Sequence, residues 1–219
     1  MNEIKANSRR KFISTSVTTF TGLAFIPQFG FANERYADDN IHIIGPKAGY
    51  SPQIGTLVSM MTWMRETVLM SVRKLNQEQL DFLFDQHSNT IGAMLMHLGA
   101  TETFYQTNTF ADGFPQDYTE SDKKKWEVAM NLGEPARKSI KGHDLKYYVD
   151  MITEVREKTL AEFRKRDDDW LMKVDPKFFA GKPTNNYCKW FHVCEHESNH
   201  NGQIKWIAKR LPGVKPSEE

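Results

Sequence analysis

Three histidines near the end of the chain are spaced four residues apart, at His192, His196 and His200. Because an α-helix has 3.6 residues per turn, residues four apart lie about 40° from each other around it, and neighbouring members of this series can reach the same ion. Apolar residues that follow, such as Ile204 and Ile207, lie nearer the second pair on the helix surface. The spacing predicts His196 and His200 as metal ligands and places His192 at the edge of the buried face.

The side chains around this series have other expected roles. Gln203 is one turn beyond His200 on the same side. We therefore expect Gln203 and His192 to be outer contacts, residues that touch the ligand histidines but not the ion. Cys194 points away from the histidines and is a poor ligand candidate. Cys188 and Cys194 are six residues apart, a rise of about 9 Å along a helix, which is too far for a disulfide.

A third ligand is expected from another helix, and His97 lies within the apolar segment Met94 to Leu98. A histidine on an apolar face is more often a hydrogen-bonded core residue than a ligand. If the two helices are neighbours, however, three neutral imidazoles can hold one ion and leave a position open for water or substrate. Imidazole ligands suit Zn²⁺, our first choice, and also Ni²⁺ or another divalent ion. The remaining histidines, at 42, 87 and 143, fall in predicted loops and are expected to be exposed.

Four segments have apolar residues at three- and four-residue steps, the spacing of one helix face. They predict helices over about 52–75, 90–107, 145–166 and 185–211, the second of them capped by Ser88 or Asn89. The segment from 109 to 143 is rich in glycine and proline, and we expect a long crossover with one short helix there. No alternating strand pattern is visible. The predicted fold is all-α, an antiparallel four-helix bundle with a long crossover between helices two and three.

The segments 88–98 and 191–204, which carry these histidines, resemble the DinB-like superfamily of metal-binding four-helix bundles. The resemblance covers about residues 52–213. It implies that His97, His196 and His200 bind a divalent ion. Related enzymes include S-transferases and isomerases that use low-molecular-weight thiols. The stretch Asp167 to Leu171 is similar to the acidic turn of that family.

The same residues also read His-Glu-x-x-His, the zinc-peptidase pattern, with Glu197 as the would-be proton acceptor. That pattern normally needs a third ligand further on, and after His200 the chain has no histidine and only Glu218 and Glu219 as acidic residues. We therefore treat a peptidase as a minor alternative. Glu197 could accept a proton in another reaction, although an exposed surface position is at least as good an interpretation. Glu195 and Glu102 have the same surface interpretation, and a contact behind one of the metal ligands is the lesser option for them.

Two classes of function follow from these residues. The first is a metal-dependent enzyme, of hydrolase or thiol S-transferase type, acting on a small-molecule substrate between the second and fourth helices. The second is a non-catalytic metal-binding or stress-response module. With 29 Lys and Arg against 28 Asp and Glu, the balanced charge gives no reason to expect nucleic acid as a partner. A homodimer is compatible with the sequence, which does not fix the oligomeric state.

The first 32 residues predict export. Arg9 and Arg10 precede a modestly apolar stretch that ends in small residues, the pattern of a twin-arginine signal peptide. The stretch is too short and too rich in Thr and Ser for a stable membrane anchor. We expect a signal peptide at 1–32, a linker or arm at 33–51, the bundle at 52–213 and a tail at 214–219. The expected partner during export is the twin-arginine translocase, and the expected location is the periplasm or beyond.

The export signal can be tested with a reporter. Residues 1–34 fused to a reporter that requires the twin-arginine translocase should carry it out of the cytoplasm, since the paired arginines are the feature that this translocase reads. Replacing Arg9→Lys and Arg10→Lys together should stop export, measured by cell fractionation. Unchanged export of the double variant would remove this interpretation.

Overall fold

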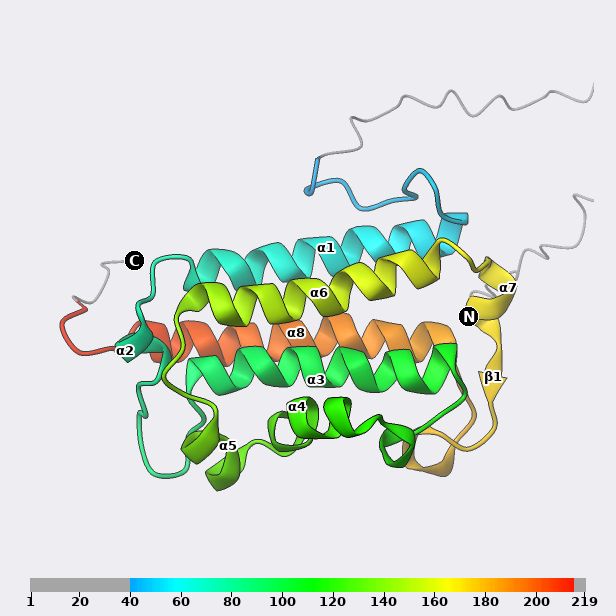
Figure 1. Cartoon of the computed structure of the whole chain (residues 1–219). Helices are drawn as coiled ribbons and strands as arrows, with labels where there is room; N and C mark the ends of the chain where they lie inside the picture. Colours follow the sequence, from blue (N-terminus) through cyan, green and yellow to red (C-terminus); the bar gives the residue numbers. More distant parts are fainter. Residues whose placement is uncertain (1–39, 215–219) are drawn as a thin grey trace, which may run out of the picture. The chain divides into compact units, whose positions relative to one another are not determined.

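The computed structural model describes residues 40–214, and four long helices dominate this part of the chain (Figure 1). They are α1 (Pro52–Val72), α3 (Ile91–Phe110), α6 (Leu145–Phe163) and α8 (Asn186–Ala208). The predicted all-α bundle is confirmed. Between residues 40 and 214, every helix is too short or too polar to cross a membrane. The predicted signal segment 1–32 lies outside the described residues, as do 33–39 of the arm and 215–219 of the tail.

The crossover decides the directions of the helices. Contacts of Gly92 with Tyr148 and of Gln106 with Val155 advance together along α3 and α6, so these two helices are parallel. The helices α1 and α8 are also parallel, and each pair runs opposite to the other (Figure 1). The second and third bundle helices run the same way because the long crossover carries the chain back along the bundle.

The four long helices end about three residues away from the predicted limits. Apolar periodicity alone misplaces these ends, because a buried side chain need not be helical. Leu211 is 3% exposed, for example, but it follows the end of α8. The predicted caps Ser88 and Asn89 were also wrong for α3. Its first turn is capped by Thr90, whose Oγ1 accepts a hydrogen bond from the backbone N–H of Ala93 at 3.1 Å.

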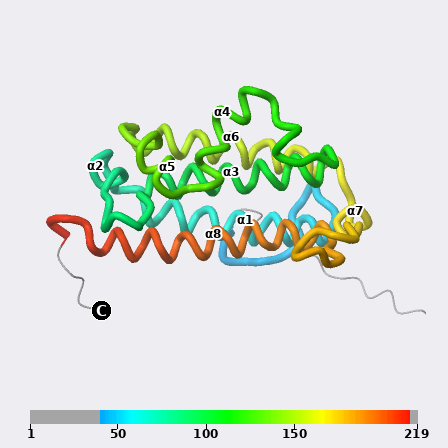
Figure 2. The backbone as a smooth tube through the Cα atoms, turned by 90° about the horizontal axis from the view of Figure 1, so that it is seen from below, coloured from blue at the N-terminus to red at the C-terminus, as the bar shows by residue number. Residues whose placement is uncertain are grey.

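The crossover contains more structure than the single short helix predicted. It holds a 3-10 turn (Pro115–Asp117) and two helices, α4 (Glu120–Asn131) and α5 (Gly133–Ser139). Leu132, with φ of 52°, separates the two helices because a left-handed residue cannot continue a right-handed helix. Figure 2 shows both crossover helices beside α3 and α6, on the side away from α1.

Two glycines let neighbouring elements approach α3 closely. A Cβ at Gly92 would lie 2.7 Å from Cζ of Tyr148, and a Cβ at Gly99 would lie 3.0 Å from Cζ3 of Trp126. Trp126 belongs to α4, so Gly99 is where the crossover packs against the bundle. This contact brings the backbone of α4 up to the helix that carries His97.

Short elements close the two ends of the bundle. They are α2 (Gln77–Leu80), α7 (Asp168–Met172), a 3-10 turn (Phe179–Gly181) and an antiparallel pair, β1 (Val174–Asp175) with β2 (Thr184–Asn185). The strands are too short for an alternating pattern to reveal them. In the acidic turn, the Asp168 carboxylate accepts hydrogen bonds from Ser51 Oγ at 2.6 Å and from the backbone N–H of Gln53 and Ile54. That turn therefore caps the start of α1.

A buried network of four charges crosses the centre of the bundle, with one residue from each long helix. Arg65 and Arg156 donate to Glu102 and Glu197 over 2.6–3.0 Å, and the four side chains are at most 9% exposed. This layer of charge, hereafter the charge network, separates two apolar clusters, one containing Leu95 and Ile204 and the other Leu57 and Trp190. It therefore ties all four helices together at one level of the bundle.

The stability of the fold should depend on this network. Burial by itself raises the pKa of Glu102, but the positive charges of Arg156 and Arg65 outweigh it and hold that pKa below its ordinary value. Glu102→Gln leaves both guanidinium groups short of negative charge and should lower the free energy of unfolding by about 3–5 kcal/mol, measured with urea at neutral pH. Because the folded-state pKa is depressed, the stabilising contribution of Glu102 should be lost as the pH falls through that value.

Glu134→Gln is the matched control, because it neutralises a glutamate that pairs with Lys138 at the surface. It should leave the free energy of unfolding nearly unchanged. Equal effects of the two substitutions would show that the network does not stabilise the fold.

Candidate metal centre

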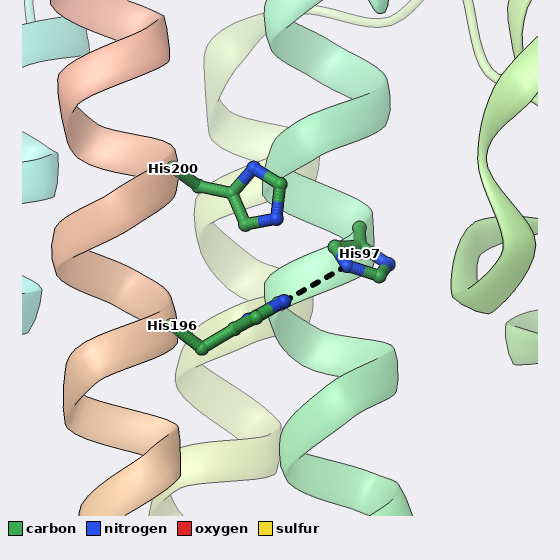
Figure 3. Close-up of side chains that lie close together, drawn as sticks. All are labelled: His97, His196 and His200. Carbon is green, nitrogen blue, oxygen red and sulfur yellow. Dashed lines mark hydrogen bonds between the residues drawn. The ribbon is translucent and has the colours of Figure 1, made fainter.

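The helices α3 and α8 lie side by side in opposite directions, and their packing brings the three predicted ligands together. His97 projects from α3, while His196 and His200 project from successive turns of α8 (Figure 3). Their ligand nitrogens all lie within 4.8 Å of one another. Between residues 40 and 214, no other group of three or more His, Cys, Asp or Glu side chains has this spacing.

The distances among the imidazoles fit a divalent ion. Nε2 of His97 lies 3.1 Å from Nε2 of His196, and the centroids of the three rings are 4.5–4.9 Å apart. In tetrahedral zinc sites, bonds of about 2.0–2.1 Å place neighbouring ligand nitrogens about 3.4 Å apart. Three protein ligands also leave a position open, as is usual at catalytic rather than structural zinc sites.

Two of the three histidines have outer contacts that orient their rings. Nδ1 of His97 donates to the backbone carbonyl of Ala129 on α4 at 2.9 Å, because a carbonyl oxygen can only accept. Nδ1 of His200 donates to Oε1 of Gln203 at 3.1 Å. With Nδ1 protonated, a neutral imidazole has its lone pair on Nε2, which is the atom available to an ion.

Burial keeps all three imidazoles neutral. It lowers the pKa of His97, and it lowers that of His200 to about 4, where the nearby His97 adds to the effect. Burial is also the main cause that lowers the pKa of His196 to about 3, and the surrounding histidines lower it further. A metal ion binds the neutral form, so the three nitrogens need lose no proton at neutral pH.

His192 stands beside this group but outside it. Its Nδ1 is 3.0 Å from the hydroxyl of Tyr105, and its ring centroid lies 5.5 Å from that of His196. Phe179 approaches the same ring at 5.4 Å. His192 thus lies between His196 and two aromatic side chains, Tyr105 and Phe179.

The expectation that Glu197 and Glu102 lie at the surface was wrong. Glu197 is 2% exposed and Glu102 is 0% exposed, because both belong to the charge network. Oε1 of Glu197 accepts hydrogen bonds from Arg65 and Arg156, whereas its buried Oε2 has no hydrogen-bond partner among the described residues. Glu195, in contrast, is exposed as its surface interpretation requires, and so are His42, His87 and His143.

Sequence reasoning missed several residues that shape the site. The carbonyl of Ala129 carries no side-chain signal, and nothing in the sequence marks Tyr105 as the partner of His192. Arg65 and Arg156 could have been noticed, because each interrupts an otherwise apolar helix face at a position where the spacing demands a buried residue. A charged residue at such a position usually needs a buried partner of opposite charge.

A groove of about 500 Å³ lies one helical turn from the histidines. Gln203, which accepts a hydrogen bond from His200, lines this groove. The lining mixes polar and apolar side chains from α3, α8 and the loop before α3: Ser88, Asn89, Met94, Asn199, Gln203, Trp206 and Ile207. It lies between the second and fourth bundle helices, where the sequence predicted a substrate pocket.

Comparison with known proteins places this architecture in a family. A search of curated proteins gave no match. The family model described as mycothiol S-transferase matches residues 56–213, which include all four bundle helices apart from the first turn of α1, and all three histidines. The chain therefore belongs to the mycothiol S-transferase family, a DinB-like family.

Proposed function

We propose that this protein is a metal-dependent thiol S-transferase, which joins a low-molecular-weight thiol to a small electrophilic molecule. The observation that carries the proposal is the group of three neutral imidazoles on facing helices, His97, His196 and His200. Outer contacts turn the ligand nitrogens of two of them toward the group. Membership of the family supports the class of reaction.

The three histidines would hold a divalent ion, with Zn²⁺ favoured and Ni²⁺ or another divalent ion compatible. Such an ion lowers the pKa of a thiol and so supplies the thiolate, which is the nucleophilic form. In the transfer, the thiol releases its proton to solvent and its sulfur forms a bond to an electrophilic carbon. The bond from that carbon to the leaving group breaks, and the leaving group departs with the electron pair.

The residues of the groove would position the two reactants. Asn199 and Gln203 offer amide groups to the polar parts of a thiol, while Met94, Trp206 and Ile207 offer apolar surface to the electrophile. Binding both beside the histidines turns a reaction between two dissolved molecules into one between neighbours, which is a large source of rate enhancement.

We also propose that this reaction takes place outside the cytoplasm, after export by the twin-arginine translocase. The support is the signal pattern around Arg9 and Arg10. The thiol would then be one that is available in the periplasm or beyond.

Metal binding should depend on three histidines and not on the fourth. His97→Ala, His196→Ala or His200→Ala should each raise the dissociation constant for Zn²⁺ by more than about 100-fold, since losing an outer contact alone typically raises it by about 10- to 100-fold. His192→Ala is the control and should raise it far less. Competition with a chromophoric chelator measures all four constants. Equal loss in His192→Ala with none in His97→Ala would place the ion on α8 alone.

Turnover distinguishes an enzyme from a module in which the ion only stabilises the bundle. The protein loaded with Zn²⁺ should convert a thiol and an aryl halide or epoxide into a conjugate. Mass spectrometry measures this conjugate, with mycothiol, glutathione and free cysteine as the thiols tested. Removing the ion by chelation should abolish turnover, and adding Zn²⁺ back should restore it, because the ion supplies the thiolate. A protein that binds the ion but gives no conjugate with any thiol would favour the non-catalytic module.

A further inference from the structure

One buried hydroxyl on the helix that carries His97 has no hydrogen-bond partner among the described residues. Thr101 on α3 is 7% exposed, and its Oγ1 makes no hydrogen bond among the described residues. A buried polar group without a partner destabilises a protein by about 1–3 kcal/mol. Such a group therefore calls for an explanation in terms of what it meets when the protein works.

Other threonines of the same helix do not share this property. The hydroxyls of Thr103, Thr107 and Thr109 each donate to the backbone carbonyl four residues earlier, at 2.9, 3.1 and 2.7 Å. This is the usual way for a helical threonine to satisfy its hydroxyl. Thr101 would have the carbonyl of His97 for this purpose and does not use it. Its hydroxyl is thus uncommitted to its own helix.

The contacts between α3 and α8 indicate the level at which Thr101 lies along the pair of helices. His97 meets His200, and Tyr105 meets His192 two turns further along α3. Thr101 is midway between His97 and Tyr105 in the sequence, and successive residues four apart lie only about 40° from each other around a helix. In an antiparallel pair, the residue of α8 midway between His200 and His192 is His196. Thr101 therefore lies at the level of His196, on the face of α3 that carries His97.

We infer that Thr101 is a thiol-recognition residue, whose hydroxyl donates a hydrogen bond to the sulfur of a thiolate held at the three histidines. This inference rests on the proposed S-transferase function and adds the residue that recognises the reacting atom. A hydroxyl is a suitable donor, because hydrogen bonds to an ionised acceptor are about twice as strong as those between neutral groups. Two of the imidazoles have no such donor to spare, since the Nδ1–H groups of His97 and His200 already donate to Ala129 and Gln203.

The test uses the whole protein loaded with Co²⁺, whose bond to sulfur gives a charge-transfer absorption that reports thiol binding directly. The probe thiol is 2-mercaptoethanol. Thr101→Val keeps the shape of the side chain and removes the hydroxyl, so it should weaken binding of the probe by about tenfold or more, as expected for one hydrogen bond to a charged acceptor. The affinity for Co²⁺ itself should stay within about threefold of the original.

Thr103→Val is the matched control, because Thr103 is a buried threonine of the same helix whose hydroxyl is already bonded to Gly99. It should leave the affinity for 2-mercaptoethanol unchanged. Thr101→Ser, which restores a hydroxyl, should recover most of the lost affinity. Urea unfolding of the metal-free variants adds a structural readout: Thr103→Val should destabilise the protein, and Thr101→Val should not.

The outcomes separate this inference from the proposed function. Undiminished binding of 2-mercaptoethanol by Thr101→Val would overturn the inference and leave the proposed function standing. Equal losses of thiol and Co²⁺ affinity would also overturn it, since the hydroxyl would then support the metal site as a whole. If the unaltered protein binds Co²⁺ but no thiol, the inference and the proposed function both fail.

Discussion

The charge network of Arg65, Glu102, Arg156 and Glu197 is the constraint on which the rest of the structure depends. Apolar helix faces can slide past each other by a turn and still remain buried, but a buried charge must meet its partner. Each long helix contributes one member, so the network fixes the register of all four at once. Glu197 directly follows His196, and Glu102 is five residues beyond His97. The register that pairs the charges therefore also brings the histidines together.

The network explains why the site lies on one seam of the bundle. Glu197 and His196 are adjacent, so they point about 100° apart on α8. If Glu197 points into the centre, His196 and His200 must turn toward α3. On α3, Glu102 likewise points into the centre, while His97 turns toward α8. Two arginines balance two glutamates, so the centre gains no net charge that would disturb an ion nearby. The charges stabilise the framework, and the imidazoles remain neutral because burial lowers their pKa values.

The fold and the three histidines were predictable because both depend on helical periodicity, which the sequence displays directly. His97 could be joined to the other two only by assuming that the second and fourth helices are neighbours, an assumption that the structure confirms. Glu102 and Glu197 were misjudged because a single sequence does not show which charge will meet which. The contact of His97 with Ala129 was equally hidden, since it uses a backbone carbonyl and depends on how Gly99 admits Trp126 of the crossover.

The arrangement also bears on the peptidase interpretation of the same residues. A zinc peptidase of the His-Glu-x-x-His type needs its glutamate beside the ion, free to take a proton from water. Here the histidines of that pattern face α3, while Glu197 is 2% exposed in the core, where its Oε1 accepts hydrogen bonds from two arginines and its Oε2 has no partner among the described residues. The pattern is thus divided between two sites, a charge network and a group of imidazoles. The groove of mixed polarity next to the imidazoles, with Thr101 on the same face of α3, is the part of the site that the proposed reaction of a thiol with a small electrophile would use.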